Sequence, residues 1–380
     1  MTKFSAKQQI RFDLIQLYIS GDLTGFEVAQ TLEISERHVR RLAREFKSRG
    51  IESLFHGNIG RSPVNKISDS LRRRIADLYR LKYKGFNLAH FREKLMDVEK
   101  LDPIPSYSTI RDILFSKKIL APQTRRRKKT HARRKRYERE GIMVQIDGSH
   151  HRWFSGCLPV CLTAAVDDAT GKIVGAKFSK TETTFAAMDV VEQILVDHGK
   201  FQMLYSDRAG VYTNHKRDGF SNLKTALHEL GIVSVQASSP QAKGRVERLF
   251  RSLQSRLVSE LRLANIRTIE EGNMFLKKFI EEYNRMFAVP AKSPDSAYEK
   301  LPFSYPIDQH MCFRHTRVVG NGEVISLNGS RFVIKHEGLD TLYRQTIEAR
   351  EYRNGCLRFF YQGEELEGEY IEGIFKSKAS

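Results

Sequence analysis

Three carboxylates in the middle of the chain could together hold divalent metal ions. Asp147 lies inside the apolar run MVQIDGS, Asp207 ends the run FQMLYSD, and Glu247 stands in the first turns of a long amphipathic segment, with 39 residues between Asp207 and Glu247. Hard cations prefer oxygen ligands, and two Mg²⁺ ions about 3.5 to 4 Å apart can activate an attacking oxygen and neutralise a leaving one. These three residues are therefore candidates for a catalytic two-metal site.

Each of these carboxylates also has an ordinary structural explanation. An aspartate inside a strand is unfavourable for β structure, so the position of Asp147 favours a functional role. Asp207 alone could close a turn at the end of a strand, and Glu247 alone is an ordinary surface residue of a helix. Only the combination of the three favours a metal site.

Two further pairs of residues compete for places in such a site. Asp167 and Asp168 are followed by Ala-Thr-Gly, so we predict that they form a turn rather than bind metal. His150 and His151 could act as ligands or proton shuttles. Because adjacent residues of a strand point to opposite faces, at most one of them can face the site, and packing or an edge position is an equal alternative.

The elements that must position the carboxylates follow an α/β pattern. From Gly141 the order is strand, strand, strand, helix, strand, helix, strand, helix, with a further amphipathic helix, TIEEGNMFLKKFIEEYNRMF, after them. This order predicts an α/β core with C-terminal helices over residues 141–305. After Pro306, short runs separated by Gly and Asn turns predict a small antiparallel β-barrel over residues 306–380.

The charge of the chain points to a polyanionic partner. The 380 residues include 64 Lys and Arg against 45 Asp and Glu, a formal net charge of +19. Residues 1–140 carry 33 basic and 16 acidic side chains, so nearly all of the excess lies in the first third. A concentrated excess of this kind is typical of a protein that binds a phosphate backbone, and a role in solubility alone is the alternative.

Residues 1–56 carry the pattern of a helix-turn-helix DNA-binding domain. Thr24-Gly25-Phe26-Glu27 has the form of a capping box for a second helix, and Ser35 precedes a third. In such a trio the third helix enters the major groove. Its outward residues are candidates for DNA contacts, with a solvated basic face as the alternative: Arg37, His38, Arg40, Arg41 and Arg44.

A similar plan repeats after the linker at residues 57–67. Over residues 68–121, Ser68, Asn87 and Ser106 each precede an apolar helical pattern, which predicts a second helix-turn-helix-like domain. The third of these helices offers four residues to DNA: Tyr107, Ser108, Thr109 and Arg111.

A basic linker at residues 122–140 joins this domain to the core. Between Arg125 and Arg136 it holds nine Lys or Arg and almost no apolar side chains, so it cannot pack by itself. We expect it to lie along a phosphate backbone or groove, with a merely solvated linker as the alternative. The nine residues are Arg125, Arg126, Arg127, Lys128, Lys129, Arg133, Arg134, Lys135 and Arg136.

Three side chains near Glu247 could hold a DNA end. Lys243, Arg251 and Gln254 stand four residues before, four after and seven after Glu247, which places them on a nearby face of one helix.

The composition excludes several classes of protein. No run approaches the roughly 18 apolar residues that a membrane span needs, and the N-terminal segment lacks the apolar region of a secretory signal. The four cysteines are few, and no histidine pair completes a zinc site. We therefore expect a soluble, cytoplasmic protein with reduced cysteines and no membrane partner.

The strings around the three carboxylates resemble a known family. QIDGSHHRWF, YSDRAGVYTN and SSPQAKGRVERLFRSLQSRL, in this order after tandem helix-turn-helix patterns, resemble bacterial insertion-sequence D,D-E transposases with a retroviral-integrase-type catalytic core, the ISNCY group in particular. The resemblance covers nearly the whole chain. It departs from retroviral integrases in lacking their His/Cys zinc module, and Ala209 stands where a glycine-rich turn is expected, which leaves only Gly210.

The resemblance implies a fold and a chemistry. It implies an RNase H-like core, two Mg²⁺ ions or Mn²⁺ in their place, and Asp147, Asp207 and Glu247 as the metal-binding triad. It also implies binding to terminal inverted repeats and to target DNA, and a homo-oligomer, at least a dimer, that pairs two ends. As a bacterial protein it would associate with the nucleoid when bound to DNA.

We therefore predict a transposase that cleaves DNA by two-metal hydrolysis and joins it by strand transfer. Two alternatives remain: a helix-turn-helix regulator whose RNase H-like core is not catalytic, and a metal-dependent nuclease without strand transfer. The repeat sequence, the target preference and the copy-and-paste or cut-and-paste route do not follow from the residues.

Overall fold

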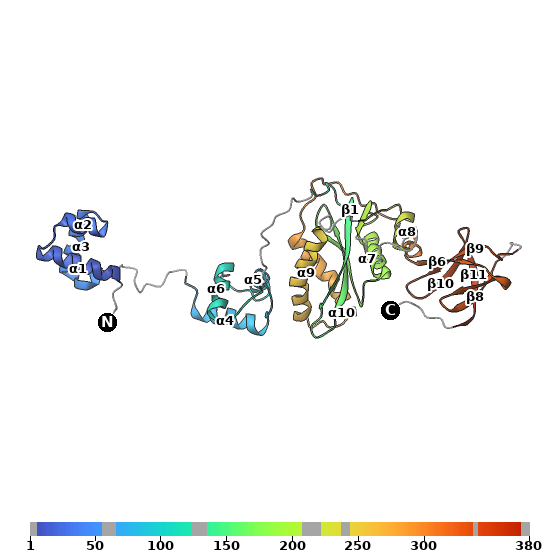
Figure 1. The fold of residues 1–380 in the computed structure, drawn as a ribbon, viewed down its shortest axis with the longest axis horizontal. Helices are drawn as coiled ribbons and strands as arrows, with labels where there is room; N and C mark the ends of the chain where they lie inside the picture. Colours follow the sequence, from blue (N-terminus) through green and yellow to red (C-terminus); the bar gives the residue numbers. More distant parts are fainter. Residues whose placement is uncertain are drawn as a thin grey trace. The chain divides into compact units, whose positions relative to one another are not determined.

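A computed structural model describes residues 6–54, 66–122, 135–206, 222–236, 244–336 and 341–373 of the protein (Figure 1). The chain divides into two units, Met1–Arg73 and Arg74–Ser380, and each is described by itself. None of the described helices is both long enough and apolar enough to cross a membrane.

The first unit is a small helical cluster. Its elements are α1 (Ala6–Ser20), α2 (Gly25–Leu32), α3 (Glu36–Arg49) and the 3₁₀ turn η1 (Gly50–Leu54). The predicted capping box is confirmed, because Glu27 N donates to Thr24 Oγ1 (3.3 Å) and Thr24 N donates to Glu27 Oε2 (2.7 Å). Apolar side chains from all four elements meet in one core, with Ile15, Val28, Val39, Leu42 and Leu54 buried.

Three further helices follow in the chain: α4 (Asp69–Leu81), which spans the boundary between the two units, α5 (Leu88–Asp97) and α6 (Tyr107–Ser116). Asn87 and Ser106 cap α5 and α6 by accepting a backbone N–H of the first turn, as the sequence predicted. An aromatic core holds the helices together, and Tyr79 Oη donates to Phe86 O (2.7 Å) inside it. The first residues of α6, Tyr107 and Ser108, are exposed at the surface.

A five-stranded mixed sheet follows in the chain. The strands run in the order β3-β2-β1-β4-β5, with β1, β2 and β3 antiparallel and β1, β4 and β5 parallel. Four helices accompany the sheet. The strands are β1 (Met143–His151), β2 (Val160–Asp167), β3 (Ile173–Ser179), β4 (Met203–Ser206) and β5 (Val233–Gln236), and the helices are α7 (Thr184–Asp197), α8 (Asn222–Glu229), α9 (Gly244–Leu263) and α10 (Ile269–Phe287).

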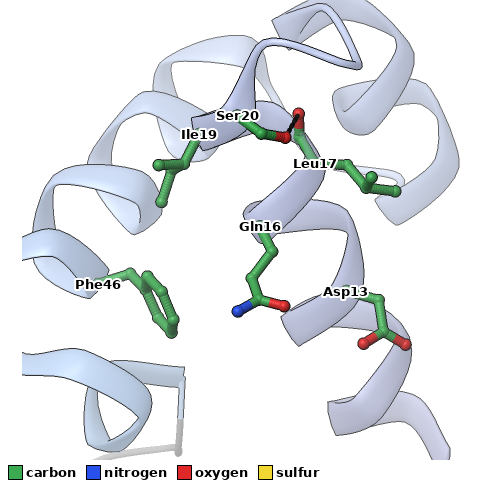
Figure 2. Close-up of a pocket in the computed structure, with 6 residues that line it drawn as sticks. All are labelled: Asp13, Gln16, Leu17, Ile19, Ser20 and Phe46. Atoms are coloured by element: carbon green, nitrogen blue, oxygen red, sulfur yellow. Dashed lines mark hydrogen bonds between the residues drawn. The ribbon is translucent and has the colours of Figure 1, made fainter.

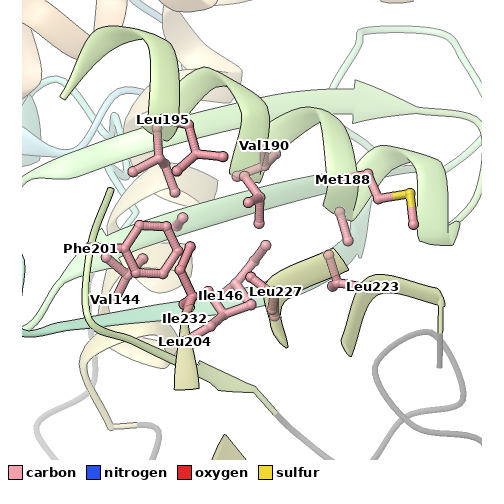
Figure 3. Close-up of a cluster of buried hydrophobic side chains, with 14 of the residues drawn as sticks. Val144, Ile146, Met188, Val190, Leu195, Phe201, Leu204, Leu223, Leu227 and Ile232 are labelled. Atoms are coloured by element: carbon pink, nitrogen blue, oxygen red, sulfur yellow. The ribbon is translucent and has the colours of Figure 1, made fainter. Parts of the chain in front are cut away.

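Each face of this sheet is covered by helices and has its own apolar core. On one face Val144 and Ile146 of β1 pack with side chains of α7 and α8, as Figure 3 shows. On the other face Leu162 and Ala164 of β2 pack with side chains of α9 and α10. Two helical layers around a mixed sheet are the α/β arrangement that the element order predicted.

Helix α5 is joined to α9 by ion pairs. Arg256 of α9 donates from Nη1 and Nη2 to the two carboxylate oxygens of Glu93 at 2.6 and 2.8 Å. Glu260 lies one turn further along α9 and contacts His90 Nε2 (2.6 Å) and Lys94 Nζ (2.7 Å). Together these contacts, here called the α5–α9 seam, attach the second helical group to α9.

The C-terminal part is a six-stranded sheet that nearly closes on itself. Its strands run in the order β6-β9-β10-β11-β8-β7, and every neighbouring pair is antiparallel. Arg317 Nε of one end strand donates to Ser326 O of the other (3.0 Å). The elements are α11 (Ile307–His310), β6 (Phe313–Val318), η3 (Asn321–Glu323), β7 (Val324–Leu327), β8 (Ser330–Lys335), β9 (Thr346–Glu351), β10 (Leu357–Tyr361) and β11 (Glu364–Gly373).

Candidate active site

Asp147 lies in the middle of β1 and faces the layer that contains α9. Its neighbours Ile146 and Val144 point into the core on the α7 side, and side chains alternate along a strand. Asp147 also pairs with Ala164, which belongs to the core on the α9 side. The carboxylate is half-buried, and its Oδ1 accepts the backbone N–H of Gly148 (3.1 Å).

Glu247 lies in the first turn of α9, on a face of the helix that is exposed to solvent. Val246, Leu249 and Phe250 on the neighbouring side of the helix are buried, whereas Glu247 is exposed. The glutamate carboxylate is therefore open to solvent at the N-terminal end of the helix.

A hydrogen bond two turns further along α9 relates Glu247 to Asp147. Gln254 Nε2 donates to Ser149 Oγ of β1 (3.3 Å). Glu247 precedes Gln254 by seven residues on one helical face, a rise of about 10 Å, and Asp147 precedes Ser149 by two strand residues, about 7 Å. Since α9 and β1 run in the same direction, the two carboxylates lie at nearly the same level of the sheet.

A buried polar network fixes the beginning of α9 against β1. Arg245 Nε donates to Asp168 Oδ1 (2.6 Å), and Gln145 Nε2 donates to the same oxygen (2.9 Å). Gln145 Oε1 in turn accepts the backbone N–H of Val246 (3.4 Å). Gln145 and Asp168 have no exposed surface, so these contacts are shielded from water. The sequence analysis missed this network, although Gln145 stands two residues before Asp147 and Arg245 two before Glu247.

Asp167 and Asp168, the alternatives to Asp147 in the sequence, make structural hydrogen bonds within the core domain. Asp167 Oδ1 accepts from Thr170 N and Thr170 Oγ1 at 2.9 and 2.8 Å, and its Oδ2 accepts from Gly141 N (2.8 Å). The turn predicted at this position is therefore confirmed. Asp168 is buried within the network and also accepts the backbone N–H of Tyr137 at its Oδ2 (3.1 Å). Both carboxylates are buried and hydrogen-bonded inside the protein.

The adjacent histidines point to opposite faces of the sheet, as predicted. By alternation along β1, His151 shares the face of Asp147, and its ring meets the ring of Trp153 edge-on at 5.2 Å. Burial lowers the pKa of His151, which favours its neutral form. His150 lies on the opposite face and is exposed.

Two residues of the predicted site lie outside the described residues. Asp207 directly follows Ser206, the last residue of β4, and Lys243 directly precedes α9. Within the described ranges no three His, Cys, Asp or Glu side chains gather closely enough to hold a metal ion. The described part of the site therefore consists of Asp147 and Glu247, with Gln254 two turns further along α9, bonded to Ser149, and Arg251 exposed on the same helix.

The predicted DNA-contacting residues of α3 are at the surface. Arg37, Arg40, Arg41 and Arg44 are exposed, and His38 is half-buried. Arg40 pairs with Glu36 of the same helix (3.0 Å). Exposed pairs of this kind contribute little to stability, so the arginine is available to a stronger anion.

The predicted DNA-contacting residues of α6 lie in the N-terminal turns of that helix. Tyr107, Ser108 and Arg111 are exposed, and Thr109 is half-buried. Thr109 Oγ1 and Ser108 Oγ hydrogen-bond to the capping Ser106 at 2.8 and 2.9 Å.

Most of the basic linker, from Arg125 to Arg134, lies outside the described residues, and the next two basic residues, Lys135 and Arg136, differ in their contacts. Lys135 is exposed. Arg136 Nη1 donates to Asp168 O (3.3 Å) and to Ala169 O (3.0 Å), and its pKa is lowered, first by burial. Arg136 therefore attaches the end of the linker to the core.

A pocket in the first unit contains none of the predicted site residues. It opens between α1 and α3, and its lining residues are shown in Figure 2. Asp13 is the one carboxylate among them, and Phe46, Leu17 and Ile19 give it an apolar wall. A single carboxylate beside apolar side chains does not suggest a catalytic site.

The chain is similar over most of its length to two proteins that are named as transposases. It is 34% identical over 364 residues to y4bF of Sinorhizobium fredii (strain NBRC 101917 / NGR234), covering 94% of this chain and 79% of that protein. It is 32% identical over 382 residues to the transposase for insertion sequence IS1202 of Streptococcus pneumoniae, covering 89% of this chain and 80% of that protein. No protein-family model matches the chain.

Among solved structures, the chain is similar to the intasome of simian T-cell lymphotropic virus in complex with the PP2A regulatory subunit B56 gamma. The identity is 14% and the TM-score 0.36, over 78% of this chain and 99% of that chain. A TM-score of this size does not by itself establish a common fold.

Proposed function

This chain belongs to the transposase family, and we propose that it binds the terminal inverted repeats of its element and catalyses hydrolytic cleavage and strand transfer of DNA. The observation that carries the proposal is the arrangement of Asp147 and Glu247. Both lie on one side of the sheet, at nearly the same level, on elements joined by Gln254 and Ser149.

Asp207 completes the proposed triad. β4 runs parallel beside β1, with Gln145 opposite Tyr205, and ends one residue before Asp207. This register supports a position for Asp207 near Asp147, because parallel neighbours advance along the sheet together. The carboxyl ends of strands in α/β sheets are the usual place for such sites.

The donor set fits divalent metal ions. Asp147 and Glu247 offer carboxylate oxygens, which are the ligands that Mg²⁺ and Mn²⁺ prefer, and Glu247 is open to solvent. When bound, two such ions would supply Lewis-acid activation of an attacking oxygen and neutralise the leaving oxygen. Asp147, Asp207 and Glu247 would hold them, and Gln254 and Arg251 would position the DNA end.

The proposed reaction has two steps that need no covalent enzyme intermediate. In the first, the oxygen of water bonds to the scissile phosphorus, the bond from phosphorus to the 3′ oxygen breaks, and that oxygen leaves as a 3′-hydroxyl. In the second, this 3′ oxygen attacks a target phosphorus and displaces a target 3′ oxygen, so one phosphodiester forms as another breaks. The contribution of the chain is positioning and charge neutralisation.

The helical groups are the proposed DNA-binding parts. The exposed arginine row of α3 and the exposed N-terminal turns of α6 support recognition of the repeat, since helices of this type read base edges from their N-terminal half. Residues 1–56 and 68–121 would form these domains, joined by the linker at 57–67, and the basic linker at 122–140 would track a phosphate backbone.

The remaining parts would complete a DNA complex. The sheet order and its two helical layers support an RNase H-like core over residues 141–305, and the nearly closed six-stranded sheet supports a small barrel over 306–380. We propose that two or more chains pair two element ends in the bacterial cytoplasm.

The decisive test is cleavage of a labelled duplex that ends in the terminal repeat. With Mg²⁺ we expect a nick at the repeat end and longer joined products on a denaturing gel, and with EDTA neither. Asp147→Asn and Glu247→Gln should each bind the duplex but leave it uncut. The matched control is Glu282→Gln, which removes an exposed carboxylate of α10 and should cut normally.

Each other result has a definite meaning. Near-normal cleavage by Asp147→Asn or Glu247→Gln would refute the site. Metal-dependent nicking with no joined product would favour a nuclease, and repeat binding with no cut in Mg²⁺ or Mn²⁺ would favour a regulator.

A further inference from the structure

We propose that Arg245 is a positioning residue that sets the distance between Asp147 and Glu247 by fixing the first turn of α9 against β1. The inference rests on the proposed function of the two carboxylates. It assigns Arg245 no contact with DNA or metal and places its effect in its hydrogen bond to Asp168.

The network reaches both elements of the site within two residues of each carboxylate. Gln145 shares the strand face of Asp147, and Arg245 lies two residues before Glu247. Asp168 bridges them, because its Oδ1 accepts from Arg245 Nε (2.6 Å) and from Gln145 Nε2 (2.9 Å). A shift of the first turn of α9 along the sheet would therefore stretch these bonds.

Because these bonds are buried, they determine the position of α9 more than they add to the stability of the fold. The Asp168 side chain has no exposed surface and the Arg245 side chain keeps 14%. Removing a buried ion pair in favour of apolar groups is often neutral for stability, because desolvation offsets the attraction. The direction-dependent hydrogen bonds, by contrast, define one register, which the apolar contacts of Leu249 and Phe250 do not impose by themselves.

Asp168 also accepts hydrogen bonds from Tyr137 and Arg136, so Arg245 is the better residue to vary. The backbone N–H of Tyr137 donates to Asp168 Oδ2, and Arg136 Nη1 donates to the Asp168 carbonyl oxygen. Removing both side-chain oxygens of Asp168 would therefore release Tyr137 together with α9, whereas Asp168→Asn keeps one oxygen that can accept this N–H, and the carbonyl bonded by Arg136 belongs to the backbone. A change at Arg245 acts on α9 only.

The test compares three variants of the full chain in Mn²⁺ binding, measured without DNA by the loss of the free-ion paramagnetic resonance signal. Arg245→Lys keeps the charge but not the planar donor, and Arg245→Met combined with Asp168→Asn removes the pair without leaving a buried charge. Arg248→Met is the matched control, since Arg248 is exposed one turn further along α9. Unfolding midpoints establish that each variant is folded.

We expect both Arg245 variants to bind Mn²⁺ about tenfold more weakly than the control, in line with the loss of groups that orient metal ligands. Their cleavage should need about tenfold more Mg²⁺ for half its maximal rate, and the maximal rate should fall less. If the folded double variant binds Mn²⁺ within twofold of Arg248→Met, the positioning role is wrong.

A separate variant distinguishes failure of this inference from failure of the proposed function. Glu247→Gln should lose both Mn²⁺ affinity and cleavage. If Glu247→Gln binds and cuts normally, the proposed site itself is wrong, whatever the Arg245 variants do. If only the Arg245 variants behave like the control, the site stands and the inference is refuted.

Discussion

Replacing Glu93 with glutamine should weaken the α5–α9 seam by an amount that the structure allows us to calculate. Arg256 makes two charged hydrogen bonds to Glu93, at 2.6 and 2.8 Å, and its side chain is 10% exposed. In Glu93→Gln the buried guanidinium loses its anion and keeps only a neutral acceptor and the ring of Phe287, whose centroid is 4.6 Å away.

The expected loss is about 2 kcal/mol of unfolding free energy. Hydrogen bonds to charged groups contribute about 1.5 to 3 kcal/mol each, and breaking a fully buried pair costs about 3 to 5 kcal/mol. The Glu93 side chain keeps 30% of its surface, so solvent screens part of the interaction, and glutamine still offers one neutral acceptor. The loss therefore falls below the cost of breaking a fully buried pair, to about 2 kcal/mol.

The same pair predicts a dependence on pH. Burial acts to raise the pKa of Glu93, but the hydrogen bonds and charge of Arg256 outweigh it and hold the pKa below its ordinary value of 4.5. A carboxyl with a lowered folded pKa contributes stability that is present above the unfolded pKa and is lost as the pH falls through the folded pKa. Glu93→Gln should therefore differ most from the wild type near neutral pH and approach it in acid.

Urea unfolding of the wild type, Glu93→Gln, Arg256→Gln and the double variant measures the coupling directly. Circular dichroism and the fluorescence of Trp153, the single tryptophan, would follow the transition. The control is Asp77→Asn, which removes half of an exposed pair with Arg80 and should change stability by less than about 0.5 kcal/mol. A coupling energy of the Glu93–Arg256 pair below about 0.5 kcal/mol would refute the reasoning.

Two further predictions follow from packing and from burial. Gly272→Ala should lower the unfolding free energy by about 1 to 3 kcal/mol, because a Cβ there would lie 2.7 Å from Phe154 Cζ in the core. In the control Gly244→Ala the new Cβ meets no atom within 4 Å, so this variant should not be destabilised. Equal urea midpoints for the two variants would contradict this. The exposed Cys157 should react with a thiol reagent in the native protein well before the buried Cys161, because burial raises the pKa of Cys161 to about 11. Mass spectrometry of tryptic peptides after labelling at neutral pH measures the two reactions, and equal labelling would contradict this reasoning.

The sequence by itself determined the features that depend on residues within one or two turns of each other. Thr24 with Glu27 was predicted as a capping box and forms one, and Asn87 and Ser106, predicted to precede helices, cap them, because a cap is a bond between a side chain and a backbone group three residues away. The turn at Asp167 is of the same kind. The order of strands and helices also followed, since the period of apolar residues is a local property.

Other expectations stay predictions because they fall on residues outside the described ranges or concern a partner molecule. Asp207, Lys243 and the linker from Arg125 to Arg134 lie outside the described residues. The three carboxylates were grouped because the sequence motifs around them resemble those of a known family. The contacts of α3 and α6 with DNA concern a partner molecule. For these the experiments above are the test.

Only the tertiary structure decided which distant residues meet. The sequence does not indicate that Gln145, Asp168 and Arg245 share one network, that Glu93 pairs with Arg256 across 163 positions, or that β4 lies beside β1. Alternation along β1 puts His151 on the face of Asp147, but only the packing of the sheet decided that this face meets α9. The physical reason is that a local pattern specifies which face of an element is apolar, whereas the partner of each buried polar group depends on how all the elements pack together.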